Sequence, residues 1–246
     1  MVPPHAQVST SFPRWSSMHL ISELFSDYPI FGAFKQTIYL TLLSAVFALL
    51  IGTVVAVMRV SPVRVLQLIG TGYVNIVRNT PLTLVIVFCN LGLFIQLGVS
   101  LANKSSDTFI DTNNFRLAVL GLSVYHASFV AEAIRSGVNT VPLGQAEAAR
   151  AIGLPFLKTL RHVVLPQAFR GAIAPLGNVL IALTKNSTVA SVIGVSDSSA
   201  TMKDMMENRP DVLFVVFGIF ALGFVILTLP VGILFTSLSK RLAVKR

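Results

Sequence analysis

The sequence predicts an all-α integral membrane protein with five transmembrane helices. Of its 246 residues, 54% are hydrophobic and only 12% are charged, and the mean hydropathy is +0.77. A soluble protein of this length needs far more charge to cover its surface. Long stretches without a charged side chain recur along the chain, and basic residues gather in alternate connections between them. These features exclude an ordinary soluble domain.

Five stretches are long and apolar enough to be transmembrane helices. A helix needs about 20 apolar residues to cross roughly 30 Å of hydrocarbon, because its backbone groups must be satisfied internally. Three stretches contain no charge, and the other two contain Glu132 near one end and Lys185 two-thirds of the way along. In order, the predicted spans are residues 36–58, 79–103, 115–134, 171–194 and 212–239. Residues 1–33 precede them as a short tail, with an interfacial stretch expected around residues 15–28.

The basic residues indicate the orientation of these spans. Twelve of the 19 Lys and Arg residues lie in residues 59–78, residues 135–170 and the tail after Ser239. The same set contains only two of the ten acidic residues, counting Glu132 at its edge. Cytoplasmic connections carry the excess of Lys and Arg, so this set is predicted to be cytoplasmic. The N-terminus is then outside, residues 1–33 form an extracytoplasmic tail, and the C-terminus is cytoplasmic. The net charge of +9 reflects this asymmetry, and no nucleic-acid partner is expected.

The predicted cytoplasmic loop, residues 136–170, is polar but too patterned to be a slack linker. Residues 143–152 are rich in Ala, Gln and Glu, which favour a helix, and Gly153 is well placed to end that helix in the left-handed conformation. Pro155 suits the first turn of a second, amphipathic helix, which Pro166 is expected to break before the fourth span. Two short helices at a fixed angle form a rigid unit, which we call the elbow.

Motifs in and around the elbow resemble those of one family. Glu147-Ala148-Ala149 is followed by Gly153 six residues after the Glu, and then by Leu165-Pro166. Two further segments match, R-N-T-P-L at 78–82 and K-N-S-T-V-A-S-V-I-G-V at 185–195. The chain resembles the permease subunits of bacterial ATP-binding-cassette (ABC) importers, in the subfamily that handles polar amino acids. The likeness is greatest to permeases of actinobacterial glutamate-uptake systems.

The resemblance implies a function, partners and a location. Residues 34–246 are expected to be a permease transmembrane domain that imports a polar amino acid, glutamate by preference, by alternating access. The expected partners are a dimer of ATP-binding-cassette subunits, a second permease subunit that is identical or related, an extracytoplasmic amino-acid-binding protein and the lipid bilayer. The expected location is the bacterial cytoplasmic membrane, which the chain crosses several times.

The family's elbow contacts the ATPase, and the resemblance transfers that role to matching residues. The residues expected to couple the permease to the ATPase are Gln145, Glu147, Ala148, Ala149, Arg150 and Gly153. Without the resemblance, an amphipathic helix pair lying on the inner leaflet would be the main alternative.

Polar side chains within the predicted spans are candidates for the substrate path, because such groups usually face a bundle interior or a water-filled cavity. The fourth span carries a band of them, the third carries Glu132, and Thr80 precedes Pro81 at a helix start or break. The candidates are Thr80, Glu132, Asn178, Thr184, Lys185, Asn186 and Ser187. The Asn186-Ser187-Thr188 segment departs from the family, in which an acidic residue often precedes a Thr-Ser pair.

These polar residues also have purely structural interpretations. Glu132 can form an ion pair with Arg135 at the cytoplasmic end of the third span. The small residues of the fourth span can pack helices together, and Lys185 can extend to the outer interface. His126 is expected to form a hydrogen bond between helices rather than to bind a ligand.

No motif for catalysis or metal binding is present in the sequence. None of the 16 Gly residues is followed by Lys, which excludes the phosphate-binding loop G-x4-G-K-[ST], and neither G-x-S-x-G nor H-E-x-x-H occurs. The single Cys89 excludes a disulfide framework. We therefore expect a non-catalytic subunit without metal or cofactor, with ATP hydrolysis on a separate subunit. The alternatives are an ion-coupled secondary amino acid carrier, or an ABC permease for glutamine, arginine or histidine.

Overall fold

The computed structural model describes residues 17–242, and all regular structure in this part of the chain is helical, as predicted. Two elements, η1 and η2, are π-helices, and η3 and η4 are 3₁₀-helices. In chain order the elements are α1 (Ser17–Asp27), α2 (Ile30–Val60), α3 (Arg64–Arg78), α4 (Leu82–Val87), η1 (Phe88–Gln96), α5 (Phe109–Val138), α6 (Leu143–Ala151), α7 (Phe156–Thr159), η2 (Leu160–Val164), α8 (Leu165–Asn186), η3 (Ser187–Ile193), α9 (Ser198–Asn208), η4 (Pro210–Val212) and α10 (Leu213–Leu242).

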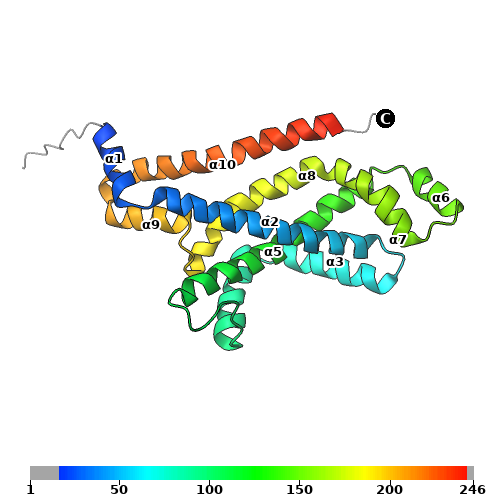
Figure 1. Cartoon of the computed structure of the whole chain (residues 1–246), viewed down its shortest axis with the longest axis horizontal. Coiled ribbons are helices and arrows are strands. Elements are labelled where there is room, and N and C mark those ends of the chain that lie inside the picture. Colours follow the sequence, from blue (N-terminus) through cyan, green and yellow to red (C-terminus); the bar gives the residue numbers. More distant parts are fainter. Residues whose placement is uncertain (1–16, 243–246) are drawn as a thin grey trace, which may run out of the picture.

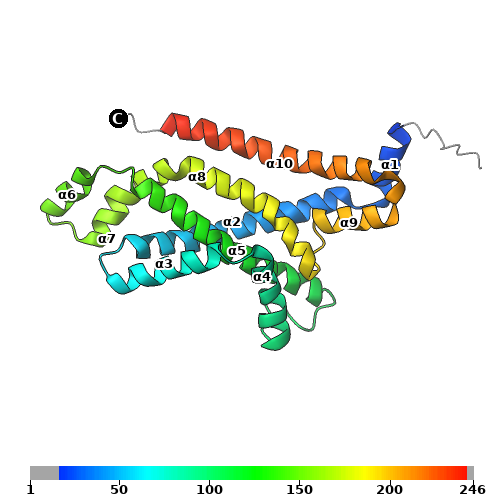
Figure 2. The ribbon, with the colours of Figure 1, turned by 180° about the vertical axis from the view of Figure 1, so that it is seen from behind.

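The long helices run between two ends of an elongated bundle (Figure 1). At one end, the α6 end, lie α6, α7 and the C-terminal end of α10; at the other, the α9 end, lie α1 and α9. Figure 2 shows the same arrangement from behind, with α4 projecting sideways from the bundle. Helix α2 begins at the α9 end and α10 finishes at the α6 end, as expected for an odd number of crossings.

Small residues bring the central helices close together. A Cβ added at Gly52 of α2 would lie 2.6 Å from the side chain of Val130 in α5, and one at Gly137 of α5 would overlap the carbonyl oxygen of Ala168 in α8. Such close approach is typical of membrane helices, which associate through van der Waals packing. Helices α2, α5 and α8 therefore form the packed centre, and α10 packs against α8 with most of its own surface exposed.

Within residues 17–242, four helices are long and apolar enough to cross a membrane, namely α2, α5, Phe156–Ile193 and Pro210–Leu242. A fifth crossing is obtained when α3 and the helix Leu82–Gln96 count as one, although the two are bent by 104° at the break between them. The structure agrees with the prediction of five spans when this bent pair is counted as a single span.

The second predicted span, residues 79–103, has different bounds in the structure: the helix Leu82–Gln96 passes as a span only together with α3, which lies within the predicted connection Arg59 to Arg78. Most of that connection forms α3, which runs back along α2 and also packs against α5. The chain then turns at Pro81, because a Pro ring does not continue a helix and the residue before it avoids the helical conformation. The charge-free run between Arg64 and Arg78 is too short to be read as a span, yet it is long enough to pack along α2.

The prediction that Pro166 separates the elbow from the fourth span is also wrong. Pro166 lies in the first turn of α8, and Phe156–Ile193 forms one continuous helix. The π-helical turn η2 directly precedes Pro166, and this wider turn accommodates a ring that would clash with the carbonyl group one turn back in an α-helix. The second helix of the elbow therefore continues directly into the fourth span.

The expected N-terminal tail is structured from Ser17 onward, while residues 1–16 lie outside the described part of the chain. Helix α1 covers the α9 end, where Leu24 packs in a cluster with Met205 of α9 and Phe220 of α10. Helix α2 starts at Ile30, earlier than the first predicted span, so the last part of the expected tail belongs to the bundle.

Candidate functional site

Gly153 ends the first helix of the elbow with a left-handed turn, as predicted. Its φ is +89°, and two hydrogen bonds close the helix there. The N–H of Gly153 donates to the carbonyl oxygen of Arg150 at 2.9 Å, and the N–H of Leu154 donates to that of Ala149 at 3.1 Å. This pair of bonds is a Schellman motif, which satisfies carbonyl groups at a helix end. The angle between α6 and α7 is thus set by a hydrogen-bonded turn.

The elbow residues divide between an exposed face and a buried one. The exposed residues expected to contact an ATPase are Gln145, Glu147, Ala148, Arg150 and Gly153. Ala149, by contrast, is only 7% exposed, so its small side chain serves packing within this chain. Two large apolar side chains, Leu143 and Ile152, are 79% and 80% exposed on the same elbow.

The elbow is connected more firmly to α8 than to α2 and α5. Gln167 in α8 donates a hydrogen bond from Nε2 to Gln145 Oε1 in α6 at 2.5 Å. A cleft of about 190 Å³ lies between the elbow and the ends of the two other helices, with Val60 of α2 and Val138 of α5 among its lining residues. Because α7 also continues into α8, a displacement of the elbow must move the start of α8.

Glu132 of α5 lies among three arginine side chains. It accepts a hydrogen bond from Arg59 Nη1 at 2.7 Å, and its other oxygen accepts two from Arg135, from Nη2 at 3.0 Å and Nε at 3.1 Å. Arg78 Nη1 is 3.7 Å from Glu132 Oε1. The predicted pairing of Glu132 with Arg135 is confirmed. Arg59 and Arg78 were not among the site residues expected from the sequence, because their charge was interpreted only as a signal of membrane orientation. The one feature of the sequence that could have indicated a site residue is the position of Arg78 at the start of R-N-T-P-L.

Asn186 at the end of α8 reaches across to α5. Its Nδ2 donates to His126 Nε2 at 3.2 Å, while His126 Nδ1 lies 3.0 Å from the carbonyl oxygen of Leu122. These partners suit a neutral imidazole that carries its proton on Nδ1. The predicted hydrogen bond between helices at His126 is confirmed, and Asn186 is its partner.

The other candidates for the path do not gather in one pocket. Thr80 lies at the break between α3 and α4, and its hydroxyl donates to Ile76 in the preceding turn. The hydroxyls of Thr184 and Ser187 are likewise bonded within their own helical segment, and both residues are buried. Asn178 and Lys185 are exposed on α8. The hydroxyl groups therefore serve local structure in this chain, whereas Asn178 and Lys185 remain accessible.

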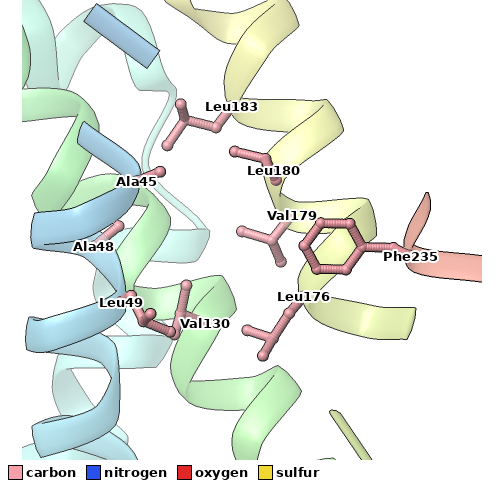
Figure 3. A pocket seen from close by; sticks show the side chains of 9 residues that line it. All are labelled: Ala45, Ala48, Leu49, Val130, Leu176, Val179, Leu180, Leu183 and Phe235. Carbon is pink, nitrogen blue, oxygen red and sulfur yellow. The ribbon is translucent and has the colours of Figure 1, made fainter. Parts of the chain in front are cut away.

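The cavity in Figure 3 is chemically unsuited to an amino acid. It measures about 160 Å³ and lies between α2, α5, α8 and α10. Its lining residues are Ala45, Ala48, Leu49, Val130, Leu176, Val179, Leu180, Leu183 and Phe235. All of these side chains are apolar, so a charged amino acid there would lose its hydration without gaining a partner. None of the candidate path residues is among them.

Comparison with known proteins identifies the family. The family described as "Binding-protein-dependent transport system inner membrane component" matches residues 30–244. The chain belongs to this family. It is 56% identical to the glutamate transport system permease protein GluC of Corynebacterium glutamicum and 55% identical to GluC of Corynebacterium efficiens. Each match covers 228 residues, which are 92% of this chain and 100% of the relative.

A solved structure supports the same permease fold. The structure titled "Crystal structure of an amino acid ABC transporter with histidines" is similar with a TM-score of 0.74 and 28% sequence identity, covering 92% of this chain and 97% of that one. The chain is therefore a permease subunit of an ABC transport system, and it crosses the inner membrane several times.

Proposed function

We propose that this permease imports glutamate into the cytoplasm, driven by ATP hydrolysis on a partner subunit. The substrate is supported by the 56% identity to a glutamate permease over that relative's whole length. The permease itself is non-catalytic in this proposal, because its sequence contains no phosphate-binding loop. Its contribution is the path through the membrane and the lever that opens it.

The exposed face of the elbow is the observation that carries this proposal. It combines charged side chains, Glu147 and Arg150, with the large and almost fully exposed apolar side chains of Leu143 and Ile152. A surface of this mixture is typical of protein contact sites. The excess of Lys and Arg supports a cytoplasmic elbow, which an ATP-binding-cassette subunit could bind there. Gly153 keeps the two helices of the elbow at one angle, so that binding is converted into displacement.

The mechanism is alternating access by a pair of permease subunits, identical or related. An extracytoplasmic binding protein delivers glutamate at the α9 end, which faces outward in this orientation. ATP-driven closure of two ATPase subunits brings the elbows together, and each elbow moves α8 because α7 and α8 form one helix. The path then opens outward, and hydrolysis returns it to the inward-facing state.

One face of α8 is suited to line the path. Ala174, Asn178, Ala182 and Lys185 recur at helical spacing and are all exposed in the single chain. Polar side chains at membrane depth are costly in lipid and usually face protein or a water-filled cavity. We therefore assign this face to the region shared with the second permease. Small Ala residues between the polar ones leave room for a substrate or for a neighbouring helix.

Uptake by the reconstituted complex tests the proposal. The permease, its ATPase and its binding protein are placed in proteoliposomes, and the uptake of labelled glutamate is measured with and without ATP. We expect uptake that requires ATP and persists when an uncoupler removes ion gradients. Uptake that the uncoupler abolishes and ATP does not drive would instead indicate an ion-coupled carrier.

A further inference from the structure

The cluster around Glu132 contains more positive than negative charge. Three guanidinium groups, those of Arg59, Arg78 and Arg135, lie within 4 Å of a single carboxylate. Within residues 17–242 no second carboxylate forms an ion pair with any of the three. Like charges this close to one another repel, and Arg78 and Arg135 are 43% and 42% exposed, so an anion from outside can reach them. The cluster therefore has an excess of two positive charges and would gain from a further anion.

The three arginines differ in the exposed fraction of their side chains and in how closely each guanidinium contacts the carboxylate of Glu132. Arg59 is 10% exposed and forms the shortest bond, so it makes the shielded pair with Glu132. Arg78 and Arg135 are 43% and 42% exposed. Arg78 is 3.7 Å from the carboxylate, beyond a good hydrogen bond, and its guanidinium lies over the ring of Phe129 at 5.2 Å from the centroid. Arg78 is thus held in place, and among the described residues its guanidinium forms no hydrogen bond to another side chain or to a backbone oxygen.

The position of the cluster matches a late step of import. Arg59 and Arg135 lie in the last turns of α2 and α5, toward the α6 end of the bundle. Arg78 is the last residue of α3, directly before the 104° break that leads into α4. Broken helices at membrane depth are tolerated where they line a cavity or a binding site. The cluster therefore joins three helices at a place suited to ligand passage.

We propose that Arg78 and Arg135 form a binding site for the side-chain carboxylate of an acidic amino acid leaving toward the cytoplasm, with Glu132 as an internal competitor. The site rests on the proposed import function and extends it to the class of substrate. A guanidinium pair matches a carboxylate in geometry and charge. Glu132 occupies the arginines when no substrate is present and weakens the binding of substrate when it arrives. Binding that is favourable but not too tight is what passage through a membrane protein requires.

Equilibrium binding to the permease–ATPase complex tests the site. The complex is placed in nanodiscs without the binding protein, and binding of labelled L-glutamate is measured, with L-glutamine as a neutral competitor. The loss of one charge-assisted hydrogen bond in Arg78→Gln should weaken glutamate binding about tenfold or more and leave competition by glutamine nearly unchanged. Arg78→Lys should recover part of the affinity, because it restores charge without the planar fork. Arg64→Gln is the matched control, since it removes the same charge from the exposed first residue of the same helix.

The variant Glu132→Gln distinguishes between two roles for the cluster, a substrate-binding site and a purely structural ion pair. If Glu132 competes with substrate, its removal should tighten glutamate binding about tenfold and slow release in uptake assays. If the cluster only holds helices together, Glu132→Gln and Arg78→Gln should both reduce the yield and stability of the complex and should not shift glutamate affinity in opposite directions. That result, or unchanged affinity in Arg78→Gln, would overturn the site.

Two further measurements identify the source of the anion and separate failure of the site from failure of the proposed function. The measurements are repeated in nanodiscs with and without anionic lipid, and the effect of Arg78→Gln should be the same in both. An effect that appears only with anionic lipid would assign the cluster to a lipid headgroup and refute the substrate site. ATP-driven uptake by the wild-type complex is measured alongside: its absence refutes the proposed function, whereas normal uptake with unaltered binding in Arg78→Gln refutes the site alone.

Discussion

Replacing Gly153 by Val strains the elbow through the backbone alone. The φ of Gly153 is +89°, and an added Cβ would meet no atom within 4 Å. The left-handed conformation costs a residue with a Cβ about 1–2 kcal/mol, and a β-branched residue lies at the upper end of that range. Relief by another conformation would break the two hydrogen bonds of the Schellman turn, each worth about 1 kcal/mol. We therefore expect a cost of about 2 kcal/mol, which lowers the population of the intact turn roughly 30-fold relative to an open one.

The assay for this change is the ratio of ATP hydrolysed to glutamate transported by the reconstituted complex. The complex that carries Gly153→Val should insert normally and its ATPase subunits should hydrolyse ATP, but it should transport severalfold less glutamate for each ATP. Gly153→Asn should stay close to wild type, because Asn tolerates the left-handed conformation. Gly98→Val is the matched control: Gly98 has φ +69° and open space around it, but it lies outside the elbow. If Gly153→Val couples as well as wild type, or if Gly98→Val uncouples equally, the elbow is not the lever.

Two further predictions concern the bundle. Burial raises the pKa of Asp197 from its ordinary value of 3.8 to about 6, although Lys203 and a backbone N–H bond to the carboxylate oppose the shift. The folded state then holds a proton that the unfolded state has released, so stability should fall as pH rises from about 4 to 6, by at most about 3 kcal/mol. Thermal unfolding of the purified complex should show this loss of stability between about pH 4 and 6. Asp197→Asn, which keeps the helix cap, should abolish the pH dependence. A wild-type stability that does not change with pH would contradict the prediction. Gly137→Ala should lower the unfolding temperature, since overpacking against the Ala168 carbonyl costs about 1–3 kcal/mol. Gly218→Ala should leave the unfolding temperature unchanged, because no atom lies within 4 Å of the added Cβ. If Gly137→Ala and Gly218→Ala changed the unfolding temperature equally, α5 and α8 would not be tightly packed at Gly137.

Local chemistry made the elbow predictable from sequence. Gly153 follows a run of good helix formers and precedes Pro155, so a left-handed helix end is the favoured local conformation. The same is true of the four long apolar helices, whose length and composition meet the demands of the bilayer by themselves. In both cases the information lies within a short stretch of sequence.

Features that depend on packing between distant segments were not predictable. Helix α3 is recognisable only once α2 and α5 provide the surface that it covers, because its charge-free run is too short to signal a span. The contact of Glu132 with Arg59 joins residues 73 positions apart. Ala149 belongs to a motif expected to face a partner, yet its direction on the helix buries it in this chain. Pro166 normally indicates a break, and a preceding π-helical turn removed that consequence.

The location of residue 147 tests most directly whether the elbow is gripped by an ATPase in the cytoplasm. Cys89 is the single cysteine of the chain, so Cys89→Ser provides a cysteine-free background for Glu147→Cys. A membrane-impermeant maleimide should label the new thiol in inside-out vesicles and not in intact cells, and addition of the ATPase subunit should protect it. Labelling in intact cells, or labelling unaffected by the bound ATPase, would contradict the account.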